Sequence, residues 1–192
     1  MARALQPVTH THRLATEADI PALHAIMDAA ISGPLSTFLT PAQVEASRMI
    51  MGVDSQLVSD RTYFLIEIDG VLAGCGGWSR RITEYGGDHT PGRVPALLTP
   101  GIDAARIRAM YTAPEFTRQG VGRLIVGLCE DAARSEGYSR VELVATMGGE
   151  PLYRASAYRE IERFEDDRGG VAVPLVRMGK SLKDTSADVG KT

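Results

Sequence analysis

The sequence has 192 residues, of which 44% are hydrophobic and 23% charged, which suits one globular domain with a hydrophobic core. Its formal net charge of −3 argues against a nucleic-acid-binding protein, because such proteins usually carry a basic excess. No apolar run approaches the ~20 residues that a membrane-spanning helix needs, so we expect no membrane partner either.

The N-terminal third predicts a short strand followed by two helices. The strand is expected at Arg13–Ala15, and Thr16–Asp19 has the pattern of a capping box before a helix. Apolar residues follow with helical spacing until Gly33-Pro34 ends the helix. Thr40-Pro41 begins a second helix in the same way. The predicted organisation is a flexible leader at 1–12, a single domain at 13–180 and a flexible tail at 181–192.

A β-hairpin is predicted next. The runs Thr62–Ile68 and Val71–Trp78 are rich in β-branched and aromatic residues, and Asp69-Gly70 joins them. Such a two-residue connection is typical of a type I′ turn, since glycine accepts a positive φ. The segment Ser79–Asp103 then holds several glycines and prolines, which predicts a long loop. Loops of this length inside a domain are usually functional or disordered.

The C-terminal half alternates strands and helices. Gly120–Glu136 is the clearest helix of the chain, because its apolar residues fall on one face. Gly137 follows as its C-cap. A shorter helix is expected from about Glu150 to Ala157. The predicted strands of this half are Ala105–Tyr111, Val141–Ala145, Ile161–Phe164 and Val171–Met178.

The turn before the main helix has the features of an anion-binding site. It runs from Thr117 to Arg123 between a strand and an amphipathic helix. The first N–H groups of a helix have no partner within it, and the helix dipole adds positive potential there. Gly120 and Gly122 let an anion approach the backbone, and Arg118 adds charge. A pyrophosphate fits this arrangement, whereas the Walker A and Rossmann patterns do not match.

This turn resembles the cofactor loop of the GNAT superfamily, whose pattern is Gln/Arg-x-x-Gly-x-Gly/Ala between a strand and a helix. Arg108–Pro114 resembles the family's fourth strand, and Pro151–Glu160 resembles its Phe/Leu-Tyr-x-x-x-Gly-Phe signature. Thr117 departs from the Gln/Arg position, and Ala157-Tyr158 replaces Gly-Phe. The resemblance covers 13–178. It implies an α/β fold with a mixed, mostly antiparallel sheet of about six to seven strands flanked by about four helices.

The resemblance further implies an N-acetyltransferase that moves an acetyl group from acetyl-CoA to a primary amine, without a metal and with a homodimer as the expected assembly. The pantetheine arm would pair with the fourth strand, which would splay from the fifth to admit it. The N–H of Met110 would donate to the thioester oxygen. The implied cofactor-binding residues are Met110, Tyr111, Thr112, Arg118, Gln119, Gly120, Val121, Gly122 and Arg123.

Tyr153 is the predicted catalytic acid, because it matches the family tyrosine and a phenol stays protonated at neutral pH. The base stays open between a water chain and a side chain, for which the candidates are Glu67, Glu84, Asp88, His89 and Glu142. The long loop is the predicted acceptor site, with an ordered cover or a dimer contact as the alternative. Its predicted substrate-binding residues are Trp78, Arg80, Arg81, Tyr85 and His89.

We predict a small metabolite or amino-acid-like amine as the acceptor. Two other functions stay open: a catalytically silent CoA-binding or regulatory module, and a protein N-acetyltransferase. Met1–His12 lacks the apolar core of a signal peptide, and Cys75 and Cys129 lie in apolar segments, as expected for buried free thiols. We therefore expect a cytoplasmic protein.

Overall fold

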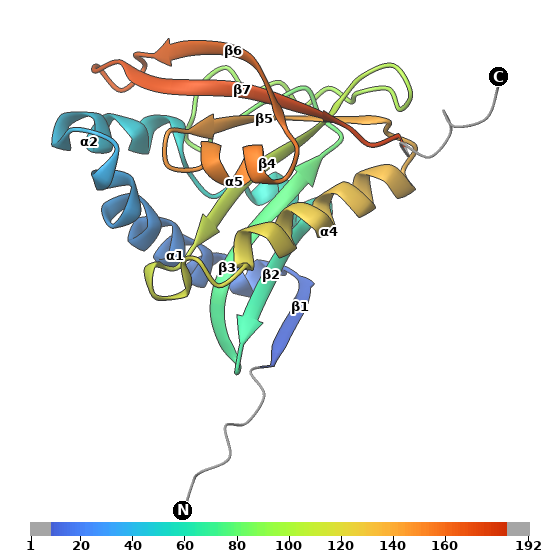
Figure 1. Cartoon of the computed structure of the whole chain (residues 1–192), viewed down its shortest axis with the longest axis horizontal. Coiled ribbons are helices and arrows are strands. Elements are labelled where there is room, and N and C mark those ends of the chain that lie inside the picture. Colours follow the sequence, from blue (N-terminus) through green and yellow to red (C-terminus); the bar gives the residue numbers. More distant parts are fainter. Residues whose placement is uncertain (1–8, 184–192) are drawn as a thin grey trace, which may run out of the picture.

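Seven strands form one sheet in the order β1-β2-β3-β4-β5-β7-β6 (Figure 1). All neighbours are antiparallel except β4 and β5, which confirms the mixed, mostly antiparallel α/β class. The computed structural model describes residues 9–183, so most of the predicted leader and tail lies outside it. The strands are β1 (His10–Leu14), β2 (Tyr63–Ile68), β3 (Val71–Ser79), β4 (Ala105–Thr112), β5 (Arg140–Thr146), β6 (Arg159–Asp166) and β7 (Val173–Ser181).

Helices cover both faces of the sheet. α4 and α5 pack on one face, over a hydrophobic cluster that includes Ile125 and Tyr153. α1, α2 and α3 pack on the other, over a cluster that includes Leu23 and Leu57. No helix in the described part of the chain is long and apolar enough to cross a membrane. The helices are α1 (Ile20–Ser32), α2 (Pro41–Ile50), α3 (Ser55–Ser59), α4 (Val121–Ser135) and α5 (Glu150–Ala155).

The predicted helix starts are present, but the first strand begins earlier than predicted. Asp19 accepts a hydrogen bond from the Thr16 backbone N–H at 2.8 Å, and Thr40 and Gln43 form a complete capping box before α2. β1 begins at His10, because residues 10–14 pair with residues 64–68 of β2. The leader predicted to extend through residue 12 is therefore corrected: residues 10–12 belong to the sheet.

The β2–β3 hairpin turns as predicted and carries glycines under α4. Asp69 and Gly70 have φ angles of 50° and 79°, as a type I′ turn requires. A Cβ at Gly74 or Gly76 of β3 would lie within 2.6 Å of a side-chain atom of α4. These glycines therefore let α4 lie close against the sheet, which fixes the position of its N-terminal end.

β4 and β5 separate toward their C-terminal ends. They pair at three positions, from Ala105 with Val141 to Ile107 with Leu143. Beyond these positions β4 stays paired with β3, and β5 stays paired with β7. Figure 1 shows β4 running diagonally with β2 and β3, while β5 lies along β7 and β6. The two halves of the sheet therefore separate beyond these positions, as the resemblance implied.

Candidate functional site

A cavity of about 110 Å³ lies in the cleft between β4 and β5. The end of α2, the loop after β3 and the first residues of α5 complete its walls. Five residues singled out from the sequence line it together, which are Glu84, Tyr85, Met110, Tyr111 and Tyr153. The cleft therefore brings the predicted acid, the predicted oxyanion donor and part of the long loop to one place.

Tyr153 lies in α5 with its hydroxyl directed into this region. Only 8% of the residue is exposed, and the hydroxyl lies 3.4 Å from the sulfur of Met110. The ring packs edge-on against Tyr158 at a centroid distance of 5.8 Å. Burial raises the pKa of Tyr153, and the neighbouring Cys129 adds to the shift. The phenol therefore stays protonated throughout the physiological pH range.

A β-bulge in β4 lies beside Tyr153. The register of β4 against β3 shifts between Cys75 and Gly77, where Ala109 and Met110 both lie opposite Gly76. Ala109 has a φ of 51°, outside the range of an ordinary strand. A bulge leaves its extra residue unpaired and redirects the backbone groups around it. The predicted donor, the Met110 N–H, thus belongs to an interrupted part of the ladder that lines the cavity.

The exposed start of α4 is the candidate pyrophosphate site. Arg118 and Gly120 have φ angles of 64° and 86°, so the backbone turns sharply before the helix. The first helical hydrogen bond runs from the Leu124 N–H to the Gly120 carbonyl at 3.0 Å. The N–H groups of residues 121–123 precede this bond and have no acceptor within the helix. Arg118 and Arg123 are exposed and form no salt bridge with any residue of the described chain.

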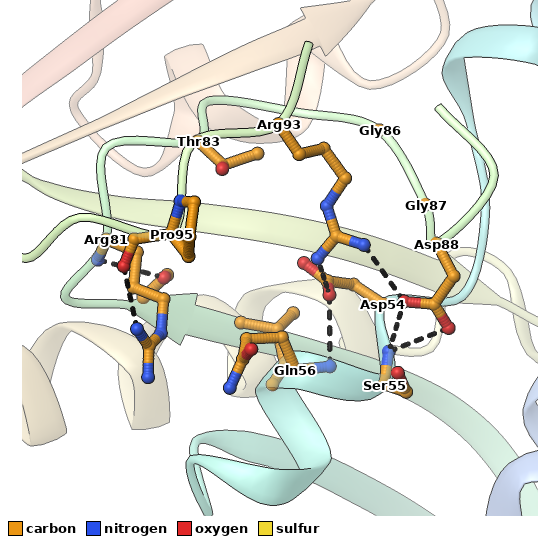
Figure 2. Close-up of polar contacts among 12 residues, drawn as sticks. Asp54, Ser55, Gln56, Arg81, Thr83, Gly86, Gly87, Asp88, Arg93 and Pro95 are labelled. Carbon is orange, nitrogen blue, oxygen red and sulfur yellow. Dashed lines mark hydrogen bonds and ion pairs between the residues drawn. The ribbon is translucent and has the colours of Figure 1, made fainter. Parts of the chain in front are cut away.

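The loop after β3, residues 80–104, is ordered by ion pairs, and we call it the roof. Arg81 pairs with Asp60 at the end of α3 at 2.6 Å. Arg93 pairs with both Asp54 and Asp88, and Figure 2 shows the three side chains converging above the start of α3. The long loop is therefore a fixed cover, which agrees with the alternative left open for it in the sequence.

Asp54 also connects the roof to β4. Its side chain is fully buried and caps α3 by accepting a hydrogen bond from the Gln56 N–H at 3.1 Å. Arg108 of β4 reaches it at 2.5 Å and also donates to the Gly86 carbonyl at 2.8 Å. Burial lowers the pKa of the Arg108 guanidinium, and the charge of Asp54 opposes that shift. This buried pair holds the roof over the cavity that Arg108 lines.

The other side of the roof is attached to β6 and β7. The Tyr85 hydroxyl donates to Asp166 at 2.8 Å, and the Arg168 guanidinium lies 5.0 Å from the centre of the Tyr85 ring. Glu84 pairs with Arg177 of β7 at 2.7 Å. Burial, together with the Asp166 hydrogen bond, raises the pKa of Tyr85 to about 12. The roof thus spans from α3 to β7 across the cleft.

The structure separates the predicted substrate-binding residues. Tyr85 lines the cavity, but the other four do not. Trp78 is 2% exposed and packs in the core. Arg80 and Arg81 pair with carboxylates at the ends of α4 and α3, and His89 contacts a backbone carbonyl at the end of α2 at 2.7 Å. These four residues support the walls or the core in this structure.

Most of the candidate bases are also engaged elsewhere. Glu67 pairs with Arg13, and Glu142 pairs with Arg106. Asp88 pairs with Arg93 within the roof. Among the five candidates Glu84 alone lines the cavity. Arg106 also lies 3.7 Å from it, so Glu84 is held between two arginines.

Sequence patterns assigned no role to Asp54 or Arg108. Arg108 lies within a mostly apolar strand, and a buried charge needs a partner of opposite charge. This position could have indicated a buried ion pair. Asp54 precedes a helix of five residues, which is too short to show apolar periodicity. The pair could not be recognised before the fold brought both residues under the roof.

Comparisons with known proteins agree with this geometry. Residues 36–156 match the model of the acetyltransferase (GNAT) family. A search of the curated proteins finds no match. A solved GCN5-related N-acetyltransferase from Rhodopseudomonas palustris has a TM-score of 0.67 at 18% identity, covering 90% of this chain and 96% of that one.

Two further solved structures share the fold. The ribosomal-protein-S18-alanine N-acetyltransferase from Escherichia coli has a TM-score of 0.57 at 15% identity, over 95% of this chain and 100% of that one. The yncA protein from Salmonella typhimurium, solved with its cofactor acetyl-CoA, has a TM-score of 0.59 at 17% identity, over 93% and 96%. At these identities the likeness shows the fold alone.

Proposed function

Because this chain belongs to the acetyltransferase (GNAT) family, we propose that it transfers an acetyl group from acetyl-CoA to the primary amine of a small molecule. The observation that carries the proposal is the cavity in which the bulge of β4 meets the protonated hydroxyl of Tyr153. The first N–H groups of α4, the helix that follows β4 in the chain, have no acceptor within the helix and would hold the pyrophosphate.

The residues present fit the chemistry that the transfer needs. Acetyl-CoA supplies the acetyl group on a thioester, so a carbon–sulfur bond breaks as a carbon–nitrogen bond forms. The Met110 N–H would donate to the carbonyl oxygen as negative charge develops on it. Tyr153 would give its proton to the departing sulfur. The amine would lose its proton to water or to Glu84, which lines the cavity.

The roof supports a small acceptor. The cavity has about 110 Å³, which is less than an engineered apolar cavity of about 150 Å³ that binds one benzene molecule. Ion pairs and hydrogen bonds fix the roof to α3, β4 and β7. A polypeptide would therefore have to displace the roof before its amine reached the site. The protein N-acetyltransferase named above shares the fold, which keeps a protein acceptor as the second candidate.

We predict that small amines are better acceptors than peptides. For one amino acid as the free amine and as the first residue of a hexapeptide, kcat/KM should differ at least ~10-fold in favour of the free amine. Acetyl-CoA consumption measures both rates. Tyr85→Phe removes the hydrogen bond to Asp166 and should narrow the difference, while Thr9→Ala, which lies before β1, should leave it unchanged. Equal rates for the two acceptors would contradict a small-molecule enzyme.

We also predict that the two exposed arginines strengthen cofactor binding. The double variant Arg118→Ala/Arg123→Ala should raise the Kd of CoA about 10-fold, because each exposed charge contributes up to ~1 kcal/mol. Titration calorimetry at low and high salt measures the effect, which should shrink as salt increases. The control is Arg159→Ala/Lys183→Ala, which removes two exposed charges elsewhere. An equal loss of CoA affinity in both double variants would show that Arg118 and Arg123 have no specific role in binding the cofactor.

The overall proposal is tested by a screen for acetyl-CoA consumption across amines, amino acids and polyamines, with a control that lacks any acceptor. Consumption stimulated by one class of amine supports an enzyme. Saturable CoA binding without turnover on any amine would favour the silent CoA-binding module. A folded chain without measurable affinity for CoA would overturn both. The cytoplasmic location and the homodimer stay proposals that fractionation and sedimentation can check.

A further inference from the structure

We propose that Tyr63 is a positioning residue that sets the direction of the Met110 N–H in the cavity. This inference rests on the proposed function, because it concerns the donor to the thioester oxygen. Tyr63 lies in β2 and is completely buried. It does not line the cavity, so it would act only through the backbone of β4.

The contact that carries the inference is the hydrogen bond from the Tyr63 hydroxyl to the Ala109 carbonyl, at 2.7 Å. This carbonyl and the Met110 N–H belong to the same peptide group. In a trans peptide the carbonyl and the N–H point in opposite directions, and the described chain contains no cis peptide. By holding the carbonyl on the core side, Tyr63 directs the N–H away from itself, toward the side where Met110 lines the cavity.

The peptide group between Ala109 and Met110 lies at the bulge, where regular strand pairing does not fix its orientation. Ala109 has a φ of 51°, and Ala109 and Met110 together lie opposite Gly76. Because the bulge interrupts the ladder, the orientation of this peptide depends on contacts beyond the β3–β4 pairing. The Tyr63 hydroxyl is such a contact, and burial raises its pKa, so it remains a donor at every working pH.

Two glycines of β3 leave the space that this arrangement needs. A Cβ at Gly77 would lie 2.7 Å from Cδ2 of Tyr63, which is closer than van der Waals contact allows. A Cβ at Gly76 would lie 2.7 Å from Cγ of Met110. The run of glycines that lets α4 pack closely thus also leaves room for the Tyr63 ring on one side of the sheet and for the Met110 side chain on the other.

The test is Tyr63→Phe, which keeps the ring and removes the hydroxyl. We expect kcat to fall about 10-fold, since the donor is loosened rather than removed. The Kd of CoA should change less than ~2-fold, because the pyrophosphate site is untouched. Infrared difference spectra of bound acetyl-CoA, labelled with ¹³C at the carbonyl, give a direct readout. The carbonyl stretch should lie lower in the wild type than in free acetyl-CoA, and return toward the free value in the variant.

Cys75→Ala is the matched control, because it removes the other contact of the hydroxyl, at 3.4 Å, and leaves the bond to Ala109. It should keep the wild-type carbonyl stretch. A folded Tyr63→Phe protein with wild-type kcat and carbonyl stretch overturns the inference. If that variant does not fold, an unshifted stretch in the wild type overturns it instead, while a shifted stretch that Gly77→Ala reduces supports it. If the wild type does not bind CoA, the proposed function itself is refuted. This outcome differs from a failure of the Tyr63 inference, in which the wild type still binds CoA.

Discussion

Tyr153→Phe is expected to lower kcat about 100-fold, which is within the range for losing a general acid. The variant should bind CoA like the wild type, because the proposed pyrophosphate site at the start of α4 does not involve this hydroxyl. It should also fold normally. The described partner of the hydroxyl is the Met110 thioether, a weak acceptor that loses little when the donor is removed.

Steady-state turnover on the best amine of the screen measures this effect, and calorimetry with CoA shows whether binding is kept. Tyr158→Phe is a close control, since it makes the same change in the ring that packs against Tyr153 but does not line the cavity. It should turn over at nearly the wild-type rate. If Tyr153→Phe retained full turnover, Tyr153 would have only a packing role.

The pH dependence gives a separate check on Tyr153. Its pKa is raised above the ordinary value of a phenol, about 10, because burial disfavours the phenolate. The acid form is therefore present below that value and is lost only as the pH rises beyond it. We expect no alkaline fall in kcat that depends on Tyr153 below about pH 10. A fall near neutrality that vanishes in Tyr153→Phe would contradict this.

Much of the fold was predictable because its signals are local. The Asp69-Gly70 turn, the cap at Thr40 and the helix stop at Gly137 each depend on neighbouring residues. β1 began earlier than predicted because residues 10–12 are exposed and polar, and only their pairing with β2 makes them a strand. α3 was missed because five residues are too few for a helical pattern.

The candidate site likewise combines features that depend on neighbouring residues with features that depend on contacts between distant parts of the chain. The turn around Gly120 could be proposed as an anion-binding site because its glycines, its arginines and the helix that follows are adjacent in sequence. Arg80 and Arg81 were expected to bind substrate because they start the long loop, yet their carboxylate partners lie in distant helices. Tyr63 carried no signal at all, since its role depends on a backbone carbonyl of another strand. Contacts across the fold are what the sequence pattern omits.

Asp54→Asn is expected to lower the free energy of unfolding by about 3–5 kcal/mol, the cost of breaking a buried ion pair. Asn caps helices as well as Asp, so the start of α3 should keep its cap. What is lost is the charge opposite Arg108, and Arg108 is only 4% exposed, so solvent compensates little for that loss. Arg93 is less affected, because it also pairs with the exposed Asp88.

Urea unfolding of the single and double variants measures this cost. In Asp54→Asn/Arg108→Met both charges are gone, so a substantial part of the lost stability should return. Asp131→Asn is the exposed control: its pair with Arg134 is mostly in solvent, and its loss should cost at most ~1 kcal/mol. Equal losses in Asp54→Asn and Asp131→Asn would show that the buried pair does not hold the roof. A large loss that the double variant relieves would mean that the buried pair of Asp54 and Arg108 stabilises the cover of the cavity.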